Sequence, residues 1–377
     1  MRSTTLQRCV CVVIALMLAF ITRYAPADES RSKSGNDISK IKAKAEMGFA
    51  HEQMQLAFAY FTGDGVPQDA VQAARWYEMA AKAGDPVAEN QIGYFNQTGI
   101  GVPVNLPRAA HWYQLAAASG LMEGEVNLAV AYLGGVGVPE DMQAARALLE
   151  KAFHKGSGRA AAYLGEVYYF GYGVPADRTT AESWYEAGVK MHDPLAGFRL
   201  GALYSGWEEH ITDLHRAVEL LRMSSDQGFL LSTHALAMIL INHPELNKST
   251  NAVHLLETCA NAGNWKSSIA LGILNRDGRF VVQDKKAAYF YFQSAARQGG
   301  NEAAALVAHD VASLKKTLSA EQQREAEADA DTWSAQHHEL LLYIIKKHGK
   351  HDRPRDLAII VAPAGSFAGG LIPIGAS

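Results

Sequence analysis

The chain has 377 residues, of which 48% are hydrophobic and 20% charged, and its formal net charge is −4. A chain this apolar is expected to fold over most of its length, either as two average domains or as one elongated domain. Neither a basic stripe nor an acidic block stands out, which argues against nucleic acid as a partner.

The first 27 residues have the pattern of a secretory signal peptide. Arginines near the start precede the apolar run Cys9–Ile21, which is too short to span a bilayer comfortably, and a small-x-small triplet ends at Ala27. We expect cleavage after Ala27; an uncleaved anchor is the alternative. The mature protein would then be periplasmic or secreted, without stable membrane insertion. Residues 28–42 are rich in serine, glycine and charge and are predicted to be a flexible lead-in.

The cysteines leave no internal disulfide to stabilise the mature protein. Cys9 and Cys11 lie in the signal segment, so Cys259 alone would remain after cleavage. Such a protein must be held together by core burial, which suits an exported bacterial protein better than a small disulfide scaffold.

The central part of the chain repeats itself at an interval of 36 residues. A turn glycine followed by Val-Pro recurs at Gly65, Gly101, Gly137 and Gly173, and a large apolar residue recurs at Trp76, Trp112, Leu148, Trp184 and Leu220. Self-similarity at a fixed period of this length is typical of a helical solenoid.

One repeat can be read as a pair of helices. The first is predicted over about 86–97, where Gly93 carries no side chain and so lets a neighbouring helix come close. Glycines 99 and 101 end it, because glycine adopts left-handed backbone angles at little cost. The second helix is predicted over about 106–119. Neither helix can bury its apolar face alone, so each repeat must pack against the next.

The register continues beyond the clearest copies. Further second helices end at Gly228, Gly263 and Gly299, which gives about seven repeats over residues 43–318. The stretch KAKAEMG, which ends at Gly48, resembles the tail of an earlier second helix. The fifth and sixth repeats lack the glycine turn and are expected to be the least regular part of the stack.

The chain after the last repeat is predicted to close the stack. Ser319 is expected to cap a polar helix, with Gln322 completing a capping box, and residues 319–350 are assigned to capping helices. The tail 351–377, rich in Gly, Pro and Ala, is expected to be weakly ordered.

The pattern A-x-x-x-L-G-x-x-Y-x-x-G-x-G-V-x-x-D followed by A-x-x-W-Y-x-x-A-A-x-x-G resembles the Sel-one-like repeat, a relative of the tetratricopeptide repeat. In the fourth repeat the matching residues are Ala160, Leu164, Gly165, Tyr168, Gly171, Gly173, Val174, Asp177, Ala181, Trp184 and Tyr185. The resemblance implies an all-α, right-handed α/α superhelical solenoid that binds other proteins. Bacterial members of the family are often exported, and include envelope regulators, assembly factors for secretion or exopolysaccharide, and factors that act when bacteria enter host cells.

No constellation for catalysis or metal binding emerges from the sequence. His337, His338, His348 and His351 lack a surrounding set of ligands at metal spacing, and neither H-E-x-x-H nor G-x-S-x-G occurs. The S-x-x-K of a serine β-lactamase occurs at Ser30 and Ser313, but its S-D-N and K-T-G partners are missing. We therefore expect no enzyme, no catalytic residue, no cofactor and no bound metal.

In this architecture the first helices line the concave wall, and a helical wheel places one column of residues opposite the packed side. We predict that this column forms a groove for partner proteins or peptides on a monomeric protein. The predicted groove residues are Phe58, Phe61, Asn90, Tyr94, Gln97, Val130, Glu166, Tyr169 and Phe198. Burial between repeats is the alternative role of each.

The leading hypothesis is a protein-binding scaffold of the bacterial envelope, or exported from it, that acts in host interaction or envelope assembly. The alternative is a periplasmic regulator that restrains a sensor protein. An enzyme active on β-lactams or peptidoglycan is the third and least favoured hypothesis.

Overall fold

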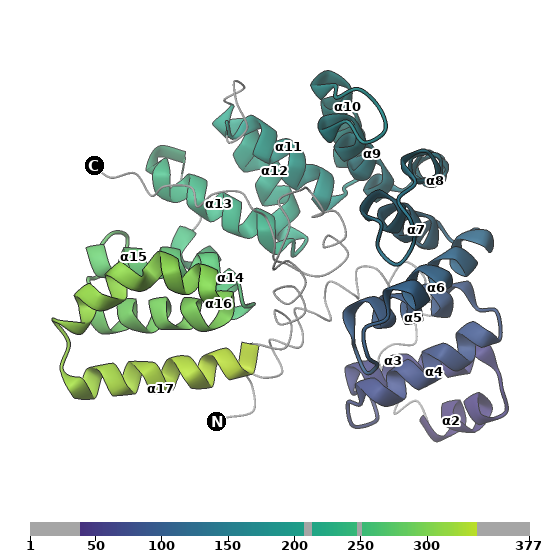
Figure 1. Cartoon of the computed structure of the whole chain (residues 1–377), viewed down its shortest axis with the longest axis horizontal. Coiled ribbons are helices and arrows are strands. Elements are labelled where there is room, and N and C mark those ends of the chain that lie inside the picture. The colour runs from purple at the N-terminus through teal and green to yellow at the C-terminus, as the bar shows by residue number, and fades with distance from the viewer. Residues whose placement is uncertain (1–37, 207–212, 247–250, 338–377) are drawn as a thin grey trace. The chain divides into compact units, whose positions relative to one another are not determined.

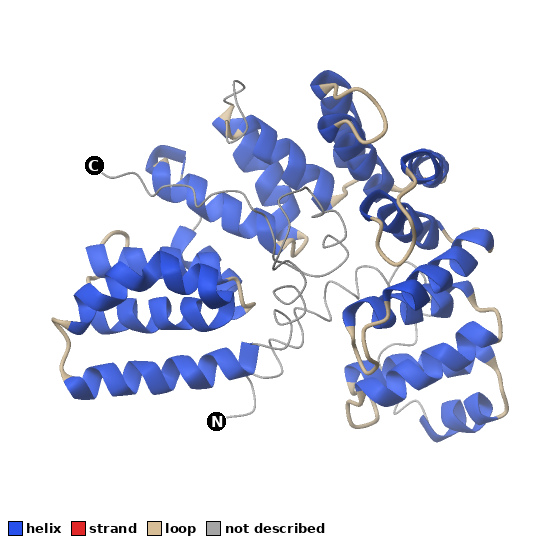
Figure 2. Cartoon of the chain, in the orientation of Figure 1, coloured by secondary structure: helices blue, strands red, loops and turns tan. Residues whose placement is uncertain are grey.

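The computed structural model describes residues 38–206, 213–246 and 251–337 (Figure 1). Within these ranges the secondary structure consists of helices and their connecting turns (Figure 2). The predicted signal segment 1–27 and the predicted tail 351–377 lie outside the described residues. The chain separates into two compact units, which divide between Ala196 and Gly197.

The N-terminal unit is a row of helices in which each helix packs against the next one in sequence. Its helices are α2 (Ile38–Glu46), α3 (Ala50–Thr62), α4 (Ala70–Lys82), α5 (Pro86–Thr98), α6 (Leu106–Ala118), α7 (Met122–Gly134), α8 (Met142–His154), α9 (Gly158–Phe170) and α10 (Arg178–Lys190). The pairs α3–α4, α5–α6, α7–α8 and α9–α10 are the helix pairs of successive repeats. The predicted solenoid of stacked helix pairs is confirmed.

The C-terminal unit continues the same pattern with more irregular connections. It follows α11 (Pro194–Tyr204), which crosses the boundary, and contains α12 (Leu214–Asp226), α13 (Leu230–Asn242), the short 3-10 helix η1 (Pro244–Leu246), α14 (Ala252–Asn261), α15 (Trp265–Asp277), α16 (Lys285–Lys315) and α17 (Ala320–His337). The connections predicted to be irregular contain residues 207–212 and 247–250, which lie outside the described residues.

Capping residues set both ends of the repeated helices. The N-cap side chains of the second helices accept hydrogen bonds from backbone N–H groups one turn into each helix, and they recur at Asp69, Asn105, Asp141, Asp177 and Asp213. Loss of such a cap costs about 1 kcal/mol. The first helices end at glycines in the left-handed conformation, namely Gly63, Gly99, Gly135 and Gly171. The residues that begin and end the repeated helices therefore recur at the same 36-residue interval.

Glycines inside the first helices allow the closest contact within a repeat. A Cβ atom placed on Gly93 would lie 2.7 Å from Cε1 of Tyr113, and one placed on Gly165 would lie closer still to the ring of Tyr185. Both tyrosine rings are buried. The structure confirms that Gly93 serves close packing and shows that its partner is the aromatic residue one helix later.

The N-terminal boundary of the folded part differs from the prediction. Residues 38–42 were assigned to the flexible lead-in, but they are helical and form the first half of α2. The reason is local packing: Ile38 and Ile41 lie against the core of the first repeats. The sequence KAKAEMG does, as predicted, belong to the tail of an earlier second helix.

At the C-terminal end, α17 covers the last repeat helix. The predicted capping box is present: the Ser319 backbone N–H donates to Oε1 of Gln322 at 2.9 Å, and the Gln322 N–H donates to Oγ of Ser319 at 3.2 Å. The side chains that α17 buries are small, namely Ala326, Ala330 and Ser334. Its charged contacts to α16 are Lys286–Glu325, Arg297–Asp331 and Lys315–Glu327. Helix α17 also makes apolar contacts, because Ala326 belongs to the core cluster of α16 and the ring of Trp333 lies 5.9 Å from that of Phe290.

Candidate functional site

The predicted groove residues fall on first helices, as expected, but they belong to two units. Phe58 and Phe61 lie on α3, the next three on α5, Val130 on α7, and the following two on α9. Phe198 lies on α11, in the C-terminal unit. The column can therefore be followed within the N-terminal unit only, from α3 to α9.

Five of the nine predicted residues are buried within the chain itself. The exposed fraction is 5% for Asn90, 7% for Gln97, 2% for Val130, 0% for Glu166 and 6% for Phe198. These side chains have little surface with which to reach a partner. Phe58, Phe61, Tyr94 and Tyr169 are half-buried and keep a surface of their own. Partner binding by any of the nine stays a prediction, and the burial favours these four aromatic residues.

Polar contacts show what the buried members of the column do. The Asn127 amide donates to Oδ1 of Asn90 at 2.8 Å, which ties α5 to α7, the first helix of the next repeat. The Tyr113 hydroxyl donates to Oε1 of Gln97 at 2.7 Å, within one repeat. These positions therefore stabilise the stack.

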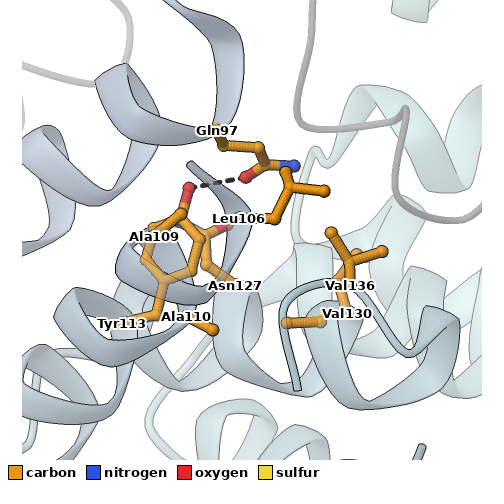
Figure 3. Close-up of a pocket in the computed structure, with 9 residues that line it drawn as sticks. Gln97, Leu106, Ala109, Ala110, Tyr113, Asn127, Val130 and Val136 are labelled. Atoms are coloured by element: carbon orange, nitrogen blue, oxygen red, sulfur yellow. Dashed lines mark hydrogen bonds between the residues drawn. The ribbon is translucent and has the colours of Figure 1, made fainter. Parts of the chain in front are cut away.

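A small cavity confirms that the column is closed between the second and third repeats. Gln97 and Val130 line it together with Leu106, Tyr113 and Val136, and the hydrogen bond between Gln97 and Tyr113 lies at its edge (Figure 3). Its volume is about 10 Å³, which is room for at most one water molecule. No partner side chain fits there.

Buried carboxylates on first helices are a feature that the sequence reading missed. Glu125 on α7 is fully buried, and its Oε1 lies 2.7 Å from the ammonium groups of both Lys151 and Lys155 on α8. Glu89, one repeat earlier, is 5% exposed, and burial, with a smaller contribution from the nearby Asp85 charge, raises its pKa above the ordinary value. The two lysines, four residues apart at the end of α8, were the sequence signal for the Glu125 pair.

Two arrangements in the described chain bear on enzymatic chemistry. A hydrogen bond of 2.8 Å joins Nδ1 of His234 to Oγ of Ser267, but Ser267 is fully buried, so a substrate cannot reach its hydroxyl. Burial lowers the pKa of His234 to about 4. Ser313 and Lys316, the S-x-x-K match, are both exposed on the last turn of α16, unlike the buried pair that β-lactamase chemistry needs. The other match, at Ser30, lies outside the described residues.

The described ranges contain neither a metal-binding cluster nor a membrane-spanning helix. No group of three or more His, Cys, Asp or Glu side chains there is arranged to hold a metal ion. His338, His348 and His351 lie beyond the described residues, and His337 ends α17. None of the helices from α2 to α17 combines the length and the apolar character that crossing a bilayer requires.

Three solved structures are similar to this chain, and the first of them supports the fold. A Sel1 repeat protein from Oxalobacter formigenes matches with 24% sequence identity and a TM-score of 0.54, over 66% of this chain and 99% of that one. A protective antigen of uropathogenic Escherichia coli with an SLR fold matches with 22% identity and a TM-score of 0.45, over 91% of this chain and 80% of that one. The immunity protein Pa5087 of Pseudomonas aeruginosa matches with 17% identity and a TM-score of 0.36, over 62% and 89% of the two chains.

Sequence comparison assigns the family. A search of curated protein sequences found no match. The family model described as Sel1 repeat matches residues 53–85, 86–121, 123–157, 158–193, 194–229 and 266–300, which together exceed half of the chain. The matched segments coincide with the helix pairs seen in the structure. Repeats of this kind form non-catalytic scaffolds that generally mediate contacts between proteins. With its matched repeats and its stacked helix pairs, the chain belongs to the Sel1 repeat family.

Proposed function

We propose that this protein is a non-enzymatic scaffold that binds partner proteins on the first helices of its N-terminal unit. The observation that carries the proposal is the row of half-buried aromatic side chains that the stack leaves on those helices: Phe58, Phe61, Tyr94 and Tyr169. Aromatic side chains with one packed face are the groups that most often dominate the energy of protein interfaces.

The packing of these aromatic residues supports a preformed surface. Phe61 and Tyr94 lie against the core of the first repeats, and the ring of Phe61 is 5.5 Å from that of Phe95. Tyr169 packs edge-on against Phe170, which is 41% exposed, with ring centroids 4.9 Å apart. Side chains held this way lose little conformational entropy when a partner binds.

The proposal includes a location for the protein, outside the cytoplasm. The signal pattern of residues 1–27 supports export to the envelope or beyond it, where the scaffold would act in host interaction or envelope assembly. Sequencing the N-terminus of protein recovered from the periplasm and from the culture medium tests this: we expect it to begin at Asp28. Protein retained in the cytoplasm with an intact N-terminus would contradict the location.

A photocrosslinking experiment tests the binding face. The photoreactive residue p-benzoylphenylalanine replaces Phe58 in one variant and Glu186 in a matched control; Glu186 is an exposed residue on the second helix α10. Both proteins are exposed to envelope extract and to host-cell lysate. We expect a defined crosslinked product from position 58 and none from position 186.

The partner then distinguishes the functional alternatives. Adducts from both positions, or from neither, would contradict binding on the first helices. A single membrane sensor among the products would favour the regulator. Changing Tyr94 and Tyr169 to aspartate should abolish the product at position 58 while circular dichroism shows an unchanged fold.

A further inference from the structure

A second surface lies beside Tyr60 and Trp76 and shares no residue with the first-helix column. An open groove of about 520 Å³ runs between α2, α4 and the turn that joins α3 to α4. Trp76 and Tyr60 supply its aromatic lining, and Lys42, Gln72 and Arg75 supply most of its hydrogen-bond donors. Its volume falls in the range of ligand-binding clefts, about 300–1,000 Å³.

The corresponding place one repeat later is bridged by charged side chains. Lys42 and Gln72 correspond to Glu78 and Arg108 at the 36-residue interval. Oε1 of Glu78 lies 2.8 Å from Nη2 of Arg108, an ion pair that joins α4 to α6, and 2.6 Å from Nζ of Lys82 within α4. In the first repeat the charge at the Glu78 position is reversed to lysine, and this bridge cannot form.

The reversal leaves cationic groups facing the groove. Lys42 and Arg75 are exposed, and within the described ranges neither has an ion-pair partner. Of the carboxylates that line the groove, Asp69 is engaged as the N-cap of α4, where it accepts hydrogen bonds from the N–H groups of Val71 and Gln72. Glu46 on α2 is the other, and within the described ranges it too has no ion-pair partner, so the groove has two unpaired cations and one unpaired carboxylate. Two unpaired cations beside an aromatic lining suit a carboxylate that is followed by an apolar side chain.

We propose that this groove binds an acidic peptide segment of a partner protein. A carboxylate of the peptide would pair with Lys42 and Arg75, and a neighbouring apolar side chain would lie against Tyr60, the half-buried aromatic residue of the lining. The site is formed by α2, α4 and the turn that joins α3 to α4, with Tyr60 of α3 in its lining, and it shares no residue with the first-helix face proposed above. A scaffold with both surfaces could hold two partners at once.

Fluorescence anisotropy on the full chain tests the proposal. The probe is a fluorescein-labelled peptide, Gly-Asp-Glu-Leu-Asp-Phe-Glu-Gly, and its control carries Asn and Gln in place of the acids. The closing variant K42E/Q72R copies the Glu78–Arg108 pair onto the groove. The matched control K190Q makes the same change in net charge at Lys190 on α10, outside the groove.

We expect the acidic probe to bind at least about tenfold tighter than the amide probe, with an affinity that falls as salt rises. The closing variant should lose about tenfold in affinity while its melting curve stays that of a folded protein, and K190Q should bind like the unchanged chain. The Phe58, Tyr94 and Tyr169 variants should also keep the probe, which separates this site from the first-helix face.

Three results would overturn the proposal. One is an absence of acidic-probe binding by the unchanged chain. The second is equal binding by the closing variant. The third is tighter probe binding after Asp28, Glu29 and Asp37 are changed to their amides, because the occupant would then be the chain's own preceding segment.

Discussion

Replacing Gly165 with alanine should destabilise the N-terminal unit, although alanine is the better helix former. In a helix interior the change from glycine to alanine is worth about 1 kcal/mol in favour of folding. Here the added methyl group would overlap the ring of Tyr185, which is 2% exposed and has no free space to move into. Overpacking of this kind costs about 1–3 kcal/mol. We therefore expect a net loss of up to about 2 kcal/mol.

The third repeat shows how the clash can be relieved. At the positions that correspond to Gly165 and Tyr185 it has Ala129 and Leu149, and both are fully buried. The double variant G165A/Y185L copies this pair into the fourth repeat. The two substitutions should therefore couple favourably, by about 1–3 kcal/mol in a double-mutant cycle.

Urea denaturation measures the unfolding free energies for this double-mutant cycle. The four proteins are the unchanged chain, both single variants and the double variant. Hydrogen exchange of α9 and α10 identifies the local change, because a repeat protein does not have to unfold in one step. If G165A raised the urea midpoint, helix propensity would outweigh packing at this position. The claim that glycine is there for close approach would then be refuted.

Three further predictions follow from the charged groups. Burial raises the pKa of Glu89, so the folded protein holds this proton more tightly than the unfolded chain. The contribution of Glu89 to the unfolding free energy should therefore rise as pH falls from 7 to the ordinary value of 4.5. In urea titrations Glu89→Gln should be the more stable protein at pH 7, and this advantage over the unchanged chain should shrink as pH falls. Replacing both Lys151 and Lys155 with methionine leaves the Glu125 carboxylate buried and unpaired; this should cost about 3–5 kcal/mol, and adding Glu125→Gln should recover most of the loss in the same assay. Raising salt to about 1 M should speed hydrogen exchange in α17 more than in α9, because its exposed ion pairs to α16 are screened; equal protection at low and high salt would show that they contribute nothing.

The repeat architecture could be predicted because its determinants recur. Gly99 ends a helix by adopting positive φ, Asn105 caps the start of the next helix, and Gly93 leaves room for the Tyr113 ring. Each of these roles follows from the type of a single residue, so a single sequence is enough to predict it. The start of α2 was placed too late because composition alone described residues 38–42. Their helix depends on Ile38 meeting a core that lies further along the chain.

The predicted groove was less accurate because a helical wheel assumes one buried face. Helix α5 has neighbours on several sides: α6 of its own repeat, α4 of the preceding one, and α7 of the next. Nine of its thirteen residues are buried as a result, including Asn90 and Gln97. A helical wheel does not include the distances between helices. Those distances determine that Tyr94 is partly exposed whereas Asn90 and Gln97 on the same helix are buried.

In a chain of repeats that share one pattern, a residue that departs from the pattern is informative about function where packing does not explain it. A residue that recurs every 36 positions, such as Trp76 and Trp112, is explained by packing that every repeat needs. Lys42 cannot be explained that way, because its counterpart Glu78 is the centre of an ion-pair bridge that the first repeat cannot make. Within the described residues Lys42 has no ion pair of its own, whereas an acidic ligand would supply one. If the closing variant proves as stable as the unchanged chain and loses only the peptide, Lys42 will be shown to serve binding and not folding.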